Sequence, residues 1–212
     1  TDLAAIDWFA SFTTAFTAAA LQATAAGEVW VTHQLNATLN AASALLEAHR
    51  LEEAMLYAER ARELGRRCRH AFYEARAEWL LRAAGYRLGQ LERADLPLLE
   101  AITRIGVRDL EALAHLTEAA IAYRGGDLEG ARALAEHAHK LWGELDDRAG
   151  ALLCRALAIA SGSVAGGDEI EALASRALGC TLEGIGVQAL GLLARARPKL
   201  AGTWVAAMET MA

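Results

Sequence analysis

Apolar residues recur three or four positions apart along most of the chain, a spacing that predicts a succession of amphipathic α-helices. The clearest case covers residues 116–148, where two such helices flank a Gly-Gly-Asp turn. The glycines can adopt the left-handed backbone that ends a helix, and Asp127 can cap the free N–H groups of the next helix. Alanines within the stripes let two backbones approach closely, so we predict a helical hairpin. The stripes are Leu116, Ala119, Ala120 and Tyr123, then Leu128, Ala131, Ala135, Ala138 and Trp142.

The same spacing returns with a period of about 40 residues. Placing Leu51 on Leu128 aligns three alanines with those of the hairpin, and a shift of about 40 residues predicts another second helix from Leu91 onward. Pro97 would lie in its first turn, where a missing N–H is tolerated, with Asp95 as the cap. We expect that helix to be the shortest. The aligned sets are Ala54, Ala58 and Ala61; Leu91, Ala94, Leu98 and Ala101; and Ile170, Leu173 and Ala177.

These positions resemble a known family. Gly126, Asp127, Leu128, Ala131, Ala135 and Ala138 have the spacing of the signature positions of a tetratricopeptide repeat, with Ala119 at the small position of the first helix. The usual closing proline is absent. The longer exit at residues 143–150 is similar to the variant of about 40 residues in sensor regions of bacterial MalT-like regulators and signal-transduction ATPases. The resemblance implies an all-α fold, a right-handed superhelix of antiparallel helix hairpins.

The sequence contains no polar or proline-rich linker, so we predict a single helical-repeat domain over residues 1–212. Its expected parts are an N-terminal helix at 2–26, repeat units at about 28–68, 69–105, 107–146 and 147–180, and C-terminal capping helices at 181–211. Residues 8–27 carry no charge, but their Ala, Thr and Ser content contributes little transfer energy. We therefore expect this stretch to pack on the first repeat rather than to span a membrane.

Charge and cysteine content narrow the class of protein. The net charge of −6 argues against nucleic acid as a direct partner. Three cysteines, Cys68, Cys154 and Cys180, are scattered singly, which fits reduced thiols in the cytoplasm better than a disulfide framework. The chain begins with Thr1 and shows no signal-peptide pattern. We expect a piece of a larger cytoplasmic protein of bacterial type.

Histidines and carboxylates show no catalytic pattern. His137 and His139 are two positions apart on one helix and face different directions, which argues against a shared metal. Cys68 and His70 meet the same objection if a helix runs through them. The acidic runs at 146–147 and 168–171 fall at helix starts, where carboxylates cap N–H groups and interact favourably with the helix dipole. The glycine-rich stretch at 161–167 lacks the lysine of a phosphate-binding loop. We predict a protein that is not an enzyme, with no catalytic residue, metal or cofactor.

Arginines crowd between residues 60 and 93, whereas residues 1–49 contain no lysine or arginine. The simplest interpretation is pairing with neighbouring glutamates: Glu59, Glu63, Glu74 and Glu78. In tetratricopeptide arrays, however, the first helices line a concave groove. Carrying over those positions predicts a partner groove of Arg76, Trp79, Tyr86, Arg87, Leu116, Tyr123 and Arg124. The same transfer also selects Asn36, Leu39, Ser43, Leu46, Ala83, Leu113, Ala120 and Arg155. For Tyr86 and Tyr123, packing between adjacent repeats is an equally open alternative.

An aromatic groove edged with guanidinium groups suits an acidic or amphipathic peptide, or a polar small effector that stacks on Trp or Tyr. Trp79 and Leu116 stand where the clamp of chaperone-binding repeats needs lysine and asparagine, which disfavours a co-chaperone. The leading hypothesis is a non-enzymatic recognition or sensor domain of a larger signalling or transcription regulator. The alternative is a free-standing adaptor or scaffold for protein–protein assembly, in one form a homodimer through the uncharged N-terminal helix.

Overall fold

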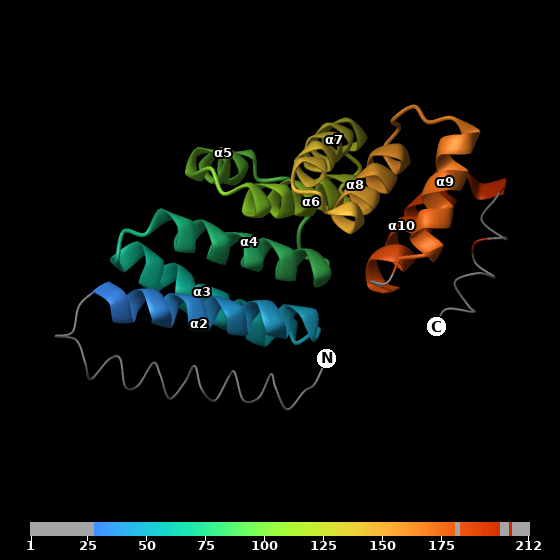
Figure 1. Cartoon of the computed structure of the whole chain (residues 1–212). Helices are drawn as coiled ribbons and strands as arrows, with labels where there is room; N and C mark the ends of the chain where they lie inside the picture. Colours follow the sequence, from blue (N-terminus) through green and yellow to red (C-terminus); the bar gives the residue numbers. More distant parts are fainter. Residues whose placement is uncertain (1–27, 181–182, 200–203, 205–212) are drawn as a thin grey trace. The chain divides into compact units, whose positions relative to one another are not determined.

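A computed structural model of the chain describes residues 28–180, 183–199 and 204 (Figure 1). Within these ranges the chain forms nine α-helices and no strand, which confirms the predicted all-α class. The helices are α2 Glu28–Glu47, α3 Leu51–Arg67, α4 Ala71–Arg87, α5 Leu96–Ile105, α6 Arg108–Arg124, α7 Leu128–Glu144, α8 Arg148–Ala160, α9 Gly167–Leu178 and α10 Glu183–Ala196. The helix predicted at 2–26 lies outside the described residues.

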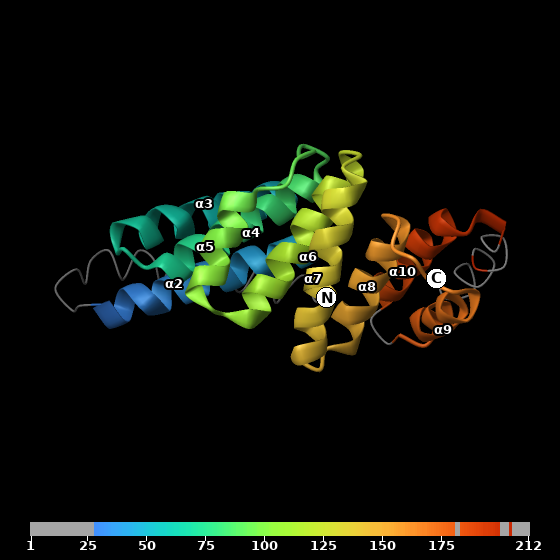
Figure 2. The same ribbon diagram turned by 90° about the horizontal axis from the view of Figure 1, so that it is seen from above.

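Within each unit, helices that follow one another from α2 to α4 and from α6 to α8 pack side by side. Between α3 and α4, Arg62 contacts Glu78 while Arg66, one turn later, contacts Glu74, one turn earlier. The same arrangement of α6 beside α7 is visible in both views (Figure 2). The first helices begin at Glu28, Ala71, Arg108 and Arg148, close to the starts predicted from the repeat.

Six of the turns between the described helices share one backbone pattern. A residue of positive φ follows the helix, and the next N–H donates to a carbonyl five residues back, which is the Schellman ending of a helix. At the central hairpin, Gly126 has φ of 86°, and the N–H of Asp127 donates to the carbonyl of Ala122 at 3.0 Å. The Asp127 side chain then accepts from the N–H of Gly130 at 2.9 Å, so the predicted cap is confirmed. The other positive-φ positions in this pattern are His49, Arg69, Gly89, Asp146 and Gly162.

The described residues of the first compact unit are 28–91 and 100–105. Its described core lies between α2, α3 and α4, where Leu35 and Leu39 pack with Leu80. The aligned alanines of α3 are all buried in this core: Ala54, Ala58 and Ala61. The small residues therefore provide the close helix contacts for which they were singled out.

The described residues of the second unit are 92–99, 106–180, 183–199 and 204. The alanine stripe of α7 is buried as predicted: Ala131, Ala135 and Ala138. The prediction that Leu128 belongs to this buried stripe was wrong, because its side chain is 48% exposed. As the first residue of α7, it lies where the helix emerges from the turn. In the fourth pair the aligned residues are all buried: Ile170, Leu173 and Ala177.

Helix α5 differs from the prediction in register. It begins at Leu96 rather than near Leu91, and it buries Leu99 and Ile102 in place of Leu98 and Ala101, which are only partly buried. The cause is local. Pro97 lies in the first turn and Asp95 caps it by accepting from the N–H of Leu98 at 3.0 Å, so the helix starts here. It is the shortest of the described helices, as expected.

Two broader expectations remain predictions. The right-handed superhelix and a single domain over residues 1–212 stay predictions, because the chain divides into two compact units. Among the described helices, none is long and apolar enough to cross a membrane.

Candidate functional site

Four residues of the predicted groove lie on α4, and the face of α4 that includes Arg76 lies against α2. The Nη2 of Arg76 donates to the Oδ1 of Asn40 at 3.1 Å, and the Nδ2 of Asn36 donates to the hydroxyl of Tyr73 at 2.9 Å. These contacts join residues 36 and 37 positions apart. The first helices of two consecutive hairpins therefore run in parallel, offset by nearly one repeat.

Arg87, the last residue of α4, contacts the C-terminal end of the neighbouring helix α2. Its Nη1 donates to the carbonyl of Leu46 at 2.5 Å, and its Nη2 lies 3.7 Å from the Oε1 of Glu47. Leu46 and Glu47 are the last residues of α2, where free carbonyls attract a cation. Part of the role of Arg87 is therefore to cap α2.

The remaining predicted residues of unit 1 divide between core and surface. Trp79 is partly buried and packs against the core, and Tyr86 is also partly buried. Leu39, Leu46 and Ala83, which the repeat alignment also selected, are buried in that core. The polar surface that α2 and α4 build together consists of Asn36, Asn40 and Arg76, with Trp79 and Tyr86 further along α4; we term it the α2–α4 face.

Leu116, Tyr123 and Arg124 belong to the second unit. Leu116 and Tyr123 pack on a cluster formed by Ala119, Ala135, Leu157 and Ala158. Arg124 is exposed in the last turn of α6. For Tyr123, the structure thus shows packing between helices α6, α7 and α8, one of the two alternatives left open. Ligand contact by these three residues stays a prediction.

Many of the crowded arginines pair with glutamates. Arg62 contacts both Glu59 and Glu78, Arg66 contacts Glu74, and Arg67 contacts Glu63. Arg155, selected as a groove residue of the fourth unit, contacts Glu169 at 2.6 Å. Such partly exposed pairs contribute little to stability. All four glutamates that the sequence suggested as partners form such ion pairs.

The acidic residues at helix starts act in two ways. Asp147 caps α8 by accepting from the N–H of Gly150 at 2.8 Å, as predicted. Helix α9, in contrast, has Gly166 at its N-cap and no side-chain cap, so Asp168 and Glu169 lie within its first turn. The prediction that these two carboxylates cap the helix was wrong, because the helix begins earlier than the sequence suggested. Their place in the first turn agrees with the predicted interaction with the helix dipole.

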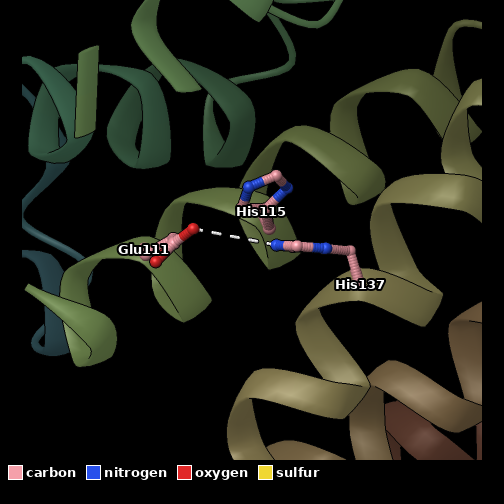
Figure 3. Close-up of side chains that lie close together, drawn as sticks. All are labelled: Glu111, His115 and His137. Carbon is pink, nitrogen blue, oxygen red and sulfur yellow. Dashed lines mark ion pairs between the residues drawn. The ribbon is translucent and has the colours of Figure 1, made fainter. Parts of the chain in front are cut away.

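Unit 2 also contains a cluster that the sequence did not predict. Glu111 and His115 lie one turn apart on α6, and His137 faces them from α7 (Figure 3). One ligand atom from each of the three lies within 4.8 Å of the others. The imidazole rings of His115 and His137 have centroids 4.3 Å apart, and the Nε2 of His137 lies 3.7 Å from the Oε1 of Glu111.

The three residues of this cluster differ in how far they are buried. Glu111 is only 1% exposed, and its Oε2 accepts from the Nη1 of Arg108 at 3.0 Å. Burial, and secondarily the charge of His137, lowers the pKa of His115 to about 4, against a smaller opposing effect of Glu111. His115 is therefore neutral near pH 7. Its Nδ1 is buried and has no hydrogen-bond partner among the described residues.

One signal in the sequence could have located this cluster. A Glu-x-x-x-His spacing places both side chains on one face of a helix, and Glu111 and His115 have it. His137 was compared only with its neighbour His139, which instead contacts the carbonyl of Ala151 through its Nδ1 at 2.9 Å. The relevant partner lies across the hairpin, at a distance in sequence that depends on how α6 and α7 are paired.

The other suspected chemistry finds no support in the structure. Cys68, His70 and residues 161–167 contribute to no metal-ligand cluster within the described part of the chain. Ser163 donates from its hydroxyl to the Oε1 of Glu136 at 2.5 Å, and the carbonyl of Val164 accepts from Arg155. The glycine-rich stretch is thus tied to α7 and α8 by its own contacts.

Comparison with known proteins identifies no relative: no protein family, no curated protein and no solved structure matches the chain.

Proposed function

We propose that this chain is a non-enzymatic helical-repeat recognition or sensor domain, which binds a protein segment or a small effector. The observation that carries the proposal is the parallel pairing of α2 and α4 through Asn40 and Arg76. In a helical-repeat array, equivalent positions of successive first helices form one continuous surface. A parallel offset of nearly one repeat is the arrangement that such a surface requires.

The α2–α4 face has a chemistry suited to recognition. Amides, a guanidinium and partly exposed rings offer hydrogen bonds and stacking without a strict shape requirement. Asn40 is exposed, and Arg76 reaches it at an exposed position. An acidic or amphipathic peptide, or a polar planar effector, matches this surface.

The wider setting of the proposal is a larger cytoplasmic regulator of bacterial type. It rests on the resemblance to tetratricopeptide sensor regions, carried by residues 126–138. In such a protein this domain would detect the ligand and a separate module would produce the response.

The test begins with a peptide-display library and a small-molecule thermal-shift screen against the whole chain. Any binder obtained is then measured against Arg76→Glu and a control, Arg132→Glu, on α7. Arg76→Glu should weaken an acidic ligand by about tenfold or more, equivalent to about 1.4 kcal/mol, and Arg132→Glu should not. The affinity should also fall with added salt, because the screening length is about 10 Å at 0.1 M.

Arg87→Glu is a poor choice for this purpose, because Arg87 also caps α2. Equal affinities of both variants and the parent would place binding elsewhere. Failure of both screens to yield a binder would count against a recognition role.

A further inference from the structure

We propose that Glu111, His115 and His137 bind one divalent transition-metal ion, with Zn²⁺ as the ion whose preferences they match. The donor set is one carboxylate and two imidazoles, both of which are common zinc ligands. The three residues come from two adjacent helices, and their ligand atoms already lie within 4.8 Å of one another.

The three ligand atoms must move closer to one another before they can bind a single ion. Zinc–nitrogen and zinc–oxygen bonds of about 2.0–2.2 Å in a tetrahedral site place ligand atoms roughly 3.3–3.5 Å apart. The Glu111 Oε1 and His137 Nε2 are 3.7 Å apart, close to this separation. The side chain of His137 is 47% exposed, so its rotation toward the other two ligands disturbs no core packing.

The two oxygens of the Glu111 carboxylate have different neighbours. Its Oε2 accepts from Arg108, whereas its Oε1 is the atom nearest His137 (Figure 3). Ligating carboxylates are commonly held by a hydrogen bond of this kind, which fixes the orientation of the second oxygen. Arg108 would therefore be a positioning residue, and its exposed side chain could move as the ion binds.

His115 provides an independent observation. A buried polar nitrogen without a partner is uncommon and needs a physical reason, and the Nδ1 of His115 is such an atom among the described residues. A metal ion bound to the ring fixes its tautomer and gives the imidazole a strong partner.

Three protein ligands leave a fourth position of a tetrahedral ion for water or an external group. That position would face the exposed side of the cluster, where His137 lies. The bound ion would connect α6 to α7 and thereby stabilise the hairpin. This inference does not depend on the proposed function, since it concerns neither Arg76 nor the α2–α4 face.

The experiment is a calorimetric titration of the whole chain with ZnCl₂ after treatment with EDTA and buffer exchange. We expect one ion per chain and a higher melting temperature with Zn²⁺ than without it. His137→Ala should weaken binding by about tenfold or more, in line with the cost of disturbing ligand shells. The control is His139→Ala, an exposed histidine on the same helix, which should bind as the parent does.

Substitution with Co²⁺ distinguishes this cluster from the exposed Cys68 and its neighbour His70. The proposal expects visible absorption typical of tetrahedral nitrogen and oxygen coordination, without a thiolate charge-transfer band. Glu111→Gln, which keeps the side-chain shape, should remove that spectrum while circular dichroism stays helical. Undisturbed binding in His137→Ala, a thiolate band, or no Zn²⁺ uptake by the parent would overturn the proposal.

Discussion

The backbone N–H of Asp95 donates to the Oε2 of Glu118 at 2.8 Å, although 23 residues separate them. Glu118 is 1% exposed within α6, and Asp95 is the residue that caps α5. The buried carboxylate thus holds the segment that leads into the shortest helix.

We expect Glu118→Ala to lower the free energy of unfolding by about 1–3 kcal/mol, because a partly buried N–H loses its acceptor. Hydrogen exchange at Asp95 should accelerate. The matched control is Glu129→Ala, an exposed glutamate in the first turn of α7. Denaturant titration with hydrogen exchange by mass spectrometry measures both effects. Unchanged exchange near Asp95 would show that Glu118 does not hold this segment.

Ala135 tests the close packing of the central hairpin. It is fully buried against Ala119 and two residues of α8. Ala135→Phe should destabilise the protein by about 1–3 kcal/mol through overpacking. Ala133→Phe places the same ring at an exposed position of the same helix and should have little effect. Thermal melts of the two variants make the comparison. If Ala135→Phe melted like the parent, close packing at this contact would be refuted.

Gly126 and Gly191 should respond to alanine in opposite directions. Gly126 has φ of 86°, and left-handed backbone costs an L-residue about 1–2 kcal/mol, so Gly126→Ala should destabilise. Gly191 lies inside α10 with open space around it, and Gly191→Ala should stabilise by roughly 0.5–1 kcal/mol. Equilibrium unfolding in urea measures both. Effects of the same sign would contradict the assigned backbone geometry.

The cysteines should differ in reactivity. Cys68 is exposed, whereas burial, and secondarily the charge of Asp147, raises the pKa of Cys154 to about 12. An alkylating reagent at neutral pH should modify Cys68 rapidly and Cys154 only after unfolding. Because the pKa of Cys154 is raised in the folded state, its contribution to stability is complete below about pH 9 and is lost as the pH rises toward 12. Peptide mapping after timed alkylation is the measurement. Rapid native labelling of Cys154 would contradict its burial.

The sequence predicted well what depends on local spacing. Ala131, Ala135 and Ala138 are buried, and Asp127 caps α7, because periodicity and turn chemistry act over a few residues. The register of α5 was wrong because a fixed period was carried through a segment whose helix start is set by Asp95 and Pro97. Counted from the helix start, the repeat is kept: Ala54, Leu99, Ala131 and Ile170 are each the fourth residue of a second helix, and all are buried.

The candidate sites were harder to predict, since they depend on pairing across helices. Arg87 was assigned to a ligand groove, yet it reaches the carbonyl of Leu46, 41 residues away. His137 was compared with His139, whereas its ring lies against His115 on the neighbouring helix. In both cases residue type and local spacing were known, but the register between two helices decided the partner. That register follows from core packing, which no local motif contains.

The turn at residues 125–126 requires glycine at two neighbouring positions for different physical reasons. A side-chain carbon at Gly125 would collide with the carbonyl of Glu92, whereas none of the surrounding atoms lies within 4 Å of one built at Gly126. At Gly126 the obstacle is handedness, because its positive φ suits the mirror-image residue. A semisynthetic chain with D-alanine at position 126 should therefore be at least as stable as the parent. The turn would then distinguish two alanines that have the same atoms and differ only in chirality.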